Sequence, residues 1–139
     1  MIPNVETLMT KQVHAIESAK SVQEAAEAMA RLGIGSLLVT HGGSYIGMIT
    51  EVDVVRKVVA KKRNPSDLVV RDVMASPLIS IQSKQSILEA NGLMEEMNVR
   101  HLAVTRNNRV VGVVSVRDFL HPLTVNEKAG RIEKKASGF

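Results

Sequence analysis

The strongest constraint on this 139-residue sequence is an internal duplication at an offset of 65 residues. Residues 8–55 align with residues 73–120 without a gap, and 12 of the 48 aligned positions are identical. A repeat of about 50 residues is too short to bury a good core by itself. We therefore expect the two repeats to pack together as one pseudo-symmetric unit.

The duplication also sets the expected domain boundaries. We assign residues 1–64 to repeat 1 and residues 65–122 to repeat 2, because the Asn-Pro-Ser-Asp sequence at 64–67 favours a linker over a continuous helix. Residues 123–139 form a polar C-terminal tail, in which a short helix is expected over 124–135.

Both repeats begin with the same series of local signals. A short strand, expected at 13–16 and 78–81, leads to a Ser-x-x-Glu capping box, in which the two side chains cap the first turn of a helix reciprocally. Apolar residues then follow at helical spacing as far as Gly33 in repeat 1 and Asn98 in repeat 2. Gly and Asn are the residue types that most easily adopt the left-handed conformation at a helix end.

The second half of each repeat predicts two strands and another helix. In repeat 1 the strands are expected at 36–40 and 45–49, joined by a glycine-rich tight turn where repeat 2 has asparagines. A helix then starts at Thr50, and we interpret the cations over 56–63 as its solvated end rather than as a nucleic-acid or partner patch. Four valines of this helix are expected to turn inward: Val54, Val55, Val58 and Val59. The predicted fold class is α/β, with two β-α-β-β-α repeats.

Composition and charge exclude several classes of function. The chain has no cysteine, which rules out disulfides, thiolate metal sites and cysteine nucleophiles. It has three aromatic residues and a net charge of +4, whereas single-strand nucleic-acid binders usually stack bases on several aromatic rings. The sequence shows no apolar run long enough to span a membrane and no secretory signal, so we expect a cytoplasmic protein.

Signatures of catalysis are missing from the sequence as well. The Gly42–Gly47 spacing matches that of a phosphate-binding loop, but Met48 stands where such a loop needs lysine. The four histidines are scattered without metal-ligand spacing. We therefore expect neither an enzyme nor a catalytic cofactor, and no metal site.

Four features, repeated in the same order at a constant offset, resemble the CBS-domain family, specifically a stand-alone tandem pair (a Bateman module). They are the openings at 9–10 and 73–74, the Ser-x-x-Glu-Ala starts at 21–25 and 86–90, the segments 33–39 and 98–104, and the segments 47–53 and 112–118. No single feature is specific, but their repeated order is. The resemblance covers about residues 5–120.

This resemblance implies ligand sensing rather than catalysis. It implies that an adenosine-containing small molecule (AMP, ADP, ATP, S-adenosylmethionine or a dinucleotide) binds in two clefts between the repeats and regulates a protein that the sequence does not identify. It also implies a homodimer that forms a four-repeat disc. The alternative is a ligand-independent module with degenerate clefts, which binds protein or nucleic acid through its basic helix.

The candidate ligand residues centre on a Thr/Ser-x-x-Asp motif that follows the last strand of each repeat. The two copies are Thr50 with Asp53, and Ser115 with Asp118. An ionised carboxylate can accept both hydroxyls of a ribose cis-diol, and a helix N-terminus favours the anionic part of a nucleotide. The same motif is also an ordinary helix cap. Its duplication after two equivalent strands favours ribose contact.

By resemblance, each cleft combines the aspartate of one repeat with strand residues of the other. The first cleft would hold Thr50, Asp53, Ser80, Val99, Arg100 and His101, and the second would hold Ser115, Asp118, Ala15, Ile34 and Gly35. Arg100 can grip a phosphate, which favours the first cleft as the phosphate site, although a solvated cation explains it equally well. His101 is more simply a structural histidine than a second phosphate ligand. Arg117 either supports phosphate in the second cleft or faces water.

Overall fold

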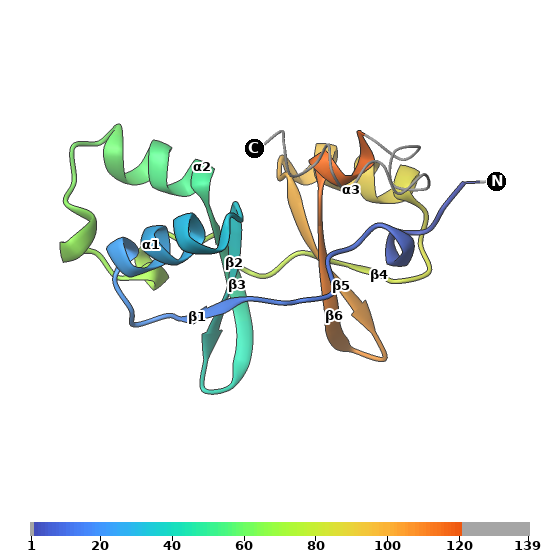
Figure 1. The fold of residues 1–139 in the computed structure, drawn as a ribbon, viewed down its shortest axis with the longest axis horizontal. Helices are drawn as coiled ribbons and strands as arrows, with labels where there is room; N and C mark the ends of the chain where they lie inside the picture. The colour runs from blue at the N-terminus through green and yellow to red at the C-terminus, as the bar shows by residue number, and fades with distance from the viewer. Residues whose placement is uncertain (1, 121–139) are drawn as a thin grey trace. The chain divides into compact units, whose positions relative to one another are not determined.

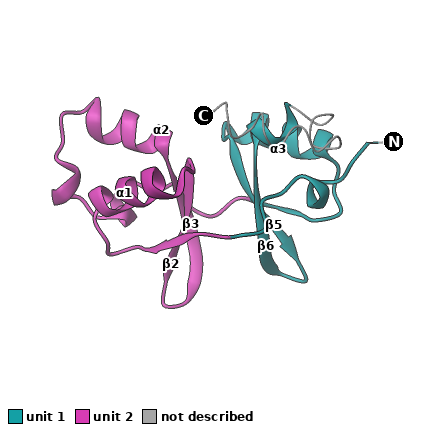
Figure 2. Cartoon of the chain, viewed as in Figure 1, with its two compact units in different colours: residues 1–12, 80–139 teal, residues 13–79 magenta. Residues whose placement is uncertain are grey.

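The structure is a computed structural model that describes residues 2–120 (Figure 1). The chain divides into two units, with residues 1–12 and 80–139 in unit 1 and residues 13–79 in unit 2 (Figure 2). The polar tail and the short helix expected over 124–135 lie outside the described residues.

Unit 2 is built around a three-stranded sheet. Its elements are β1 (Ala15–Glu17), α1 (Val22–Leu32), β2 (Ser36–His41), β3 (Ser44–Thr50) and α2 (Glu51–Val54), then a π-helical turn (Val55–Val59) and two 3-10 turns (Pro65–Asp67 and Val70–Asp72). The central strand β2 pairs with β1 in parallel and with β3 antiparallel.

Unit 1 repeats this plan on its own sheet. Its elements are a 3-10 turn (Val5–Thr7), β4 (Ser80–Gln82), α3 (Ile87–Met97), β5 (His101–Arg106), β6 (Arg109–Ser115) and a 3-10 turn (Val116–Phe119). The central strand β5 pairs with β4 in parallel and with β6 antiparallel. The predicted α/β fold class is confirmed, and the last helix of repeat 2 is a 3-10 turn as far as residue 119.

The predicted helix signals are present in both units. In α1 the Ser21 hydroxyl accepts a hydrogen bond from the Glu24 backbone N–H (3.0 Å), and the Glu24 carboxylate accepts one from the Ser21 backbone N–H (2.9 Å). The same box starts α3. Both helices end in the left-handed conformation, with φ of 68° at Gly33 and 56° at Asn98. Local sequence therefore accounts for where these helices begin and end.

The strands and turns follow the prediction with one small shift. All four central turn residues have positive φ, as a two-residue hairpin requires: Gly42, Gly43, Asn107 and Asn108. The first strand of each repeat begins two residues later than predicted, because pairing with the central strand starts only at Ala15 and Ser80.

The opening segment of each sequence repeat pairs with the sheet of the other sequence repeat, and each of these pairings lies within a single unit. Ala75 exchanges two backbone hydrogen bonds with Met48 of β3 (3.0 and 2.8 Å). Thr10 does the same with Val113 of β6 (2.8 and 3.0 Å). The two units therefore differ from the sequence repeats 1–64 and 65–122 by an exchange of these short opening segments.

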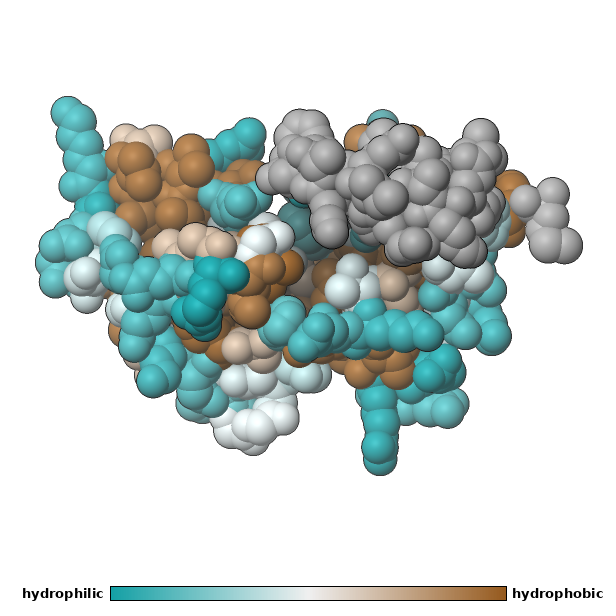
Figure 3. Space-filling view, in the orientation of Figure 1, coloured by the Kyte–Doolittle hydropathy of each residue, from teal (hydrophilic) through white to brown (hydrophobic). Residues whose placement is uncertain are grey.

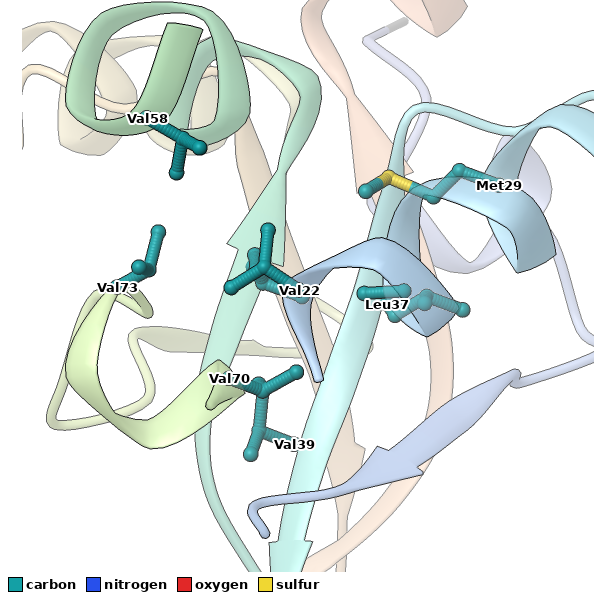
Figure 4. Packing of buried hydrophobic residues seen from close by; sticks show 9 residues of the cluster. Val22, Met29, Leu37, Val39, Val58, Val70 and Val73 are labelled. Atoms are coloured by element: carbon teal, nitrogen blue, oxygen red, sulfur yellow. The ribbon is translucent and has the colours of Figure 1, made fainter. Parts of the chain in front are cut away.

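The core of unit 2 lies between its sheet and its helices. Nine buried residues form the cluster: Val22, Ala25, Met29, Leu37, Val39, Ile49, Val58, Val70 and Val73. Figure 4 shows Val58 pointing from the π-helical turn toward Val73 and Val22. Burial of each valine, leucine, isoleucine or methionine side chain of this cluster stabilises the fold by about 1.5–3 kcal/mol.

One prediction about this core is wrong. Val58 is fully buried and Val54 packs against the cluster, but Val55 and Val59 are 57% and 63% exposed. Val54 and Val58 lie four residues apart and share the inward face, whereas Val55 and Val59 each follow one residue later and point away from it. All four valines could be buried only if a second element packed on the face of the helix that carries Val55 and Val59.

Candidate functional site

The candidate residues of unit 2 gather at the end of the sheet where β2 begins and β3 ends, which we call the unit 2 sheet end. Ser36 pairs with Thr50 there, and the Glu51 backbone N–H donates to the Gly35 carbonyl oxygen (3.0 Å). Ala15 starts the parallel strand β1 beside them. Five candidates thus share this end: Ala15, Ile34, Gly35, Thr50 and Asp53.

The Thr50–Asp53 motif forms a capping box at the start of α2. One Asp53 carboxylate oxygen, Oδ2, accepts hydrogen bonds from the backbone N–H and the hydroxyl of Thr50 (3.0 and 3.2 Å). The Asp53 backbone N–H donates back to the Thr50 hydroxyl (3.3 Å). Asp53 is only 8% exposed. The cap interpretation of this motif is therefore confirmed, and the motif holds a buried carboxylate at the sheet end.

The other Asp53 oxygen has a partner that the sequence analysis missed. Lys57 Nζ lies 3.0 Å from Asp53 Oδ1 and donates a second hydrogen bond to the Val73 carbonyl oxygen (3.0 Å). The signal was present as an Asp-to-Lys spacing of four residues on a helix, which favours an ion pair. The contact with Val73, 16 residues away, had no local signal.

The corresponding place in unit 1, the unit 1 sheet end, holds the remaining candidates. His101 pairs with Ser115 where β5 begins and β6 ends, and the Val116 backbone N–H donates to the Arg100 carbonyl oxygen (2.9 Å). Asp118 Oδ2 accepts from the Ser115 backbone N–H (2.8 Å) and hydroxyl (3.4 Å). Seven candidates share this end: Ser80, Val99, Arg100, His101, Ser115, Arg117 and Asp118.

The two sheet ends differ in charge. At the unit 2 sheet end a Cβ added to Gly35 would lie 2.7 Å from Glu51 Oε1, so a carboxylate lies directly against that glycine. The residues 65 positions later are Arg100 and Val116, which place a cation where unit 2 has glycine and an apolar residue where it has an acid. Arg117 adds a second exposed cation to unit 1. An anionic group is therefore favoured at the unit 1 sheet end.

A separate surface hollow of about 410 Å³ lies between β1 and α1 of unit 2. Of the candidate ligand residues its lining contains Ala15, together with charged residues of α1 such as Glu27 and Arg31. Thr50 and Asp53 are not part of this lining. The hollow is therefore distinct from the Thr50–Asp53 motif.

Each unit thus brings together its own candidate residues, five in unit 2 and seven in unit 1. The assignment of residues from both repeats to one shared cleft stays a prediction of the resemblance. Within residues 2–120, no group of three or more histidine or acidic side chains is placed to hold a metal ion. No helix in that part of the chain is long and apolar enough to cross a membrane.

Comparisons with protein families and with individual proteins both find CBS-domain proteins. The family model of the CBS domain matches residues 5–60 and again residues 70–124. The chain is 31% identical over 127 residues to the CBS domain-containing protein YhcV of Bacillus subtilis, with 91% of this chain and 90% of that protein covered. It is 36% identical over 99 residues to protein MK0525 of Methanopyrus kandleri, which covers 70% of this chain but only half of that protein.

A solved structure agrees with these sequence relatives. The putative signal-transduction protein with CBS domains from Burkholderia ambifaria MC40-6 superposes with a TM-score of 0.82 and 27% sequence identity. The match covers 91% of this chain and 96% of that one. The similarity therefore extends over both repeats and not over one of them alone.

Proposed function

Because the chain belongs to the CBS-domain family as a tandem pair of repeats, we propose that it is a non-catalytic regulatory module that senses an adenosine-containing ligand. Ligands of this class are AMP, ADP, ATP, S-adenosylmethionine and a dinucleotide such as NAD. A cytoplasmic location is part of the proposal, since these ligands are intracellular metabolites. The regulated protein would respond to a ligand-bound state that differs from the free state.

The observation that carries the proposal is the carboxylate that each unit holds at its sheet end. Asp53 and Asp118 both close a capping box directly after the last strand of the sheet. The box orients each carboxylate before any ligand arrives, which lowers the entropy cost of binding. A carboxylate that is held in place can accept a ribose diol through charge-assisted hydrogen bonds, each worth about 1.5–3 kcal/mol.

The charge of the two sheet ends supports a phosphorylated ligand. Arg100 and Arg117 are exposed cations at the unit 1 sheet end, and a guanidinium can bind a phosphate through two parallel hydrogen bonds. Glu51 disfavours a phosphate beside Gly35 at the unit 2 sheet end. AMP, ADP and ATP are therefore favoured over uncharged adenosine, with their phosphates near Arg100.

Thermal unfolding with added ligand tests this function. At a concentration of about one hundred times the dissociation constant, a ligand stabilises the folded state by roughly 2.7 kcal/mol. For a chain of this size the midpoint rises by several degrees. Asp53→Asn and Asp118→Asn should reduce the shift, whereas Asp67→Asn, an exposed aspartate in a linker turn, should leave it unchanged.

Two results would overturn the proposal. One is the absence of a shift with AMP, ADP, ATP, S-adenosylmethionine and NAD. The other is a shift that both aspartate variants retain in full. Either result would favour the ligand-independent interaction module, and a search for a protein or nucleic-acid partner of the basic segment 56–63 would follow.

A homodimer is the second part of the proposal, and an exposed apolar face supports it. Val52, Val55 and Val59 lie three and four residues apart and are 37%, 57% and 63% exposed. Figure 3 shows the apolar surface gathered over α2 and the π-helical turn that follows it. Contiguous apolar surface of this kind marks interaction sites. We assign this face to a second copy of the chain, as the four-repeat disc requires.

A further inference from the structure

The Asp53 carboxylate is already occupied by side chains and backbone of its own unit. A carboxylate offers about four acceptor positions to hydrogen-bond donors. Thr50 takes two of them with its backbone N–H and hydroxyl, and Lys57 takes a third with its ammonium group. Within the described part of the chain, about one position remains. A ribose cis-diol needs two, so one of the three present donors must leave before the diol binds through both hydroxyls.

The donor that leaves most easily is Lys57. The two Thr50 contacts belong to the capping box, and one of them is a backbone N–H whose position the helix start determines. The Lys57 side chain is 47% exposed, and its ammonium group is carried on a flexible aliphatic stem. A partly exposed ion pair between residues four apart on a helix is a weak interaction. Departure of Lys57 therefore costs less than opening the cap.

Departure of Lys57 also has a structural consequence. Its ammonium group bridges Asp53 to the carbonyl oxygen of Val73, the residue that follows the 3-10 turn at Val70–Asp72. That segment continues directly to Ala75, which pairs with Met48 of β3. A ligand that displaces Lys57 thus removes one link between the helix after β3 and the segment that leads out of unit 2.

The second copy of the motif lacks this residue. The position 65 residues after Lys57 is Pro122, which has no ammonium group. The two motifs therefore differ in sequence at this position, although their Thr/Ser-x-x-Asp sequences match.

We propose that Lys57 is a specificity-determining gate of the Asp53 site, which binds a ribose diol only when this lysine leaves the carboxylate. The inference rests on the proposed function, since it assumes that Asp53 contacts ribose. It also links occupation of that site to release of the Val73 carbonyl.

Calorimetric titration of the full chain with adenosine tests the gate. Asp118→Asn removes the second carboxylate, so that the Asp53 site is measured by itself, and Lys57→Met is then added in that background. Adenosine is used because it carries no phosphate. With a phosphorylated ligand, removal of the Lys57 charge would also weaken the attraction between the protein and the phosphate. We expect Lys57→Met to tighten adenosine binding by about two- to fivefold, the size of one partly exposed ion pair.

Two controls isolate the diol and the position of the lysine. 2′-Deoxyadenosine cannot present a cis-diol, so Lys57→Met should leave its affinity unchanged. Lys61→Met, at an exposed lysine four residues further on, should leave both affinities unchanged. Should the Met variant fail to fold, Lys57→Gln removes the charge with a polar side chain and should tighten adenosine binding in the same direction.

The outcomes separate the gate from the proposed function. Equal or weaker adenosine binding by Lys57→Met overturns the gate while the sensor function stands. A second outcome is that the wild type binds adenosine but Asp118→Asn does not, either alone or combined with Lys57→Met. Asp53 is then not a ribose site, and the gate is overturned as well. Failure of the wild type and of Lys57→Met to bind any adenosine compound overturns the proposed function, and the gate with it.

Discussion

Met48 and Ala75 exchange two backbone hydrogen bonds, of 3.0 and 2.8 Å, and so add the opening of repeat 2 to the edge of β3. This pairing explains a glycine that both repeats share. A Cβ at Gly47 would overlap the Ala75 carbonyl oxygen and lie 3.0 Å from Met74 Sδ. The equivalent Gly112 lies in the same way against Met9 and Thr10.

The first prediction concerns this close approach. Gly47→Ala should lower the free energy of unfolding by about 1–3 kcal/mol, because the new methyl group meets backbone that cannot rotate away. Urea unfolding measures the change. Gly92→Ala is the matched control, since it lies in α3 with nothing within 4 Å of the new Cβ. It should stabilise the protein by about 0.5–1 kcal/mol. Equal stability of Gly47→Ala and the wild type would contradict the close approach.

The second prediction concerns acid stability. Hydrogen bonds from the Ser21 and Ser86 backbone N–H groups lower the pKa of Glu24 and Glu89, both exposed. A lowered pKa in the folded state stabilises the protein fully above the ordinary glutamate value of about 4.3. This stabilisation is lost as the pH falls through the lower folded-state value. The wild type should therefore lose stability on acidification more steeply than Glu24→Gln with Glu89→Gln.

Urea unfolding of both proteins from neutral pH into the acid range measures this difference. Because hydrogen bonding is the first cause of both shifts, added salt should leave most of the difference in place. Two curves that stay parallel through the acid range would show that the capping boxes do not contribute in this way.

The third prediction concerns the phosphate. Arg100→Gln should weaken AMP binding by about tenfold while adenosine binding changes little, since the guanidinium has no phosphate to bind in adenosine. Calorimetric titration gives both affinities. Arg109→Gln is the control, because Arg109 is an exposed arginine at the hairpin turn between β5 and β6. An equal loss of affinity for AMP and adenosine would show that Arg100 does not contact the phosphate.

The fourth prediction concerns self-association. Val55→Ser combined with Val59→Ser should shift the protein toward monomer, because both side chains are exposed in the single chain and contribute apolar area to a partner. Unfolding stability of the monomer should change by less than about 0.5 kcal/mol per site. Sedimentation equilibrium reports the mass. Leu88→Ser, at an exposed leucine of α3, is the control, and a monomeric wild type would contradict the homodimer.

Much of the fold follows from signals that lie within a few residues of one another. The capping box of Ser21 with Glu24 and the left-handed residue Gly33 mark where α1 begins and ends. The positive-φ pair Asn107 and Asn108 marks the hairpin between β5 and β6. These features depend on backbone preferences and on hydrogen bonds between near neighbours. Each repeat therefore carries enough local signal to predict them, and the second repeat supports the same assignment.

The candidate site was predictable only in part, because some of its contacts join residues that are distant in the sequence. The sequence identified Asp53 and Thr50 as a motif because they are three residues apart on a helix start. It did not identify Lys57 as the partner of that carboxylate, although the four-residue spacing was present. The second contact of this lysine, with the Val73 carbonyl oxygen, had no local signal at all. The sequence did not place Glu51 against Gly35 either, since that contact depends on how β2 and α2 meet.

The sequence by itself determined the duplication, the order of strands and helices, and the position of the two aspartates after their strands. The tertiary structure decided which valines of the second helix are buried, which sheet edge receives each opening segment, and which donors already occupy Asp53. The first set rests on interactions between residues close in the chain. The second set rests on partners brought together from distant segments, where packing chooses one contact among several that the local sequence permits.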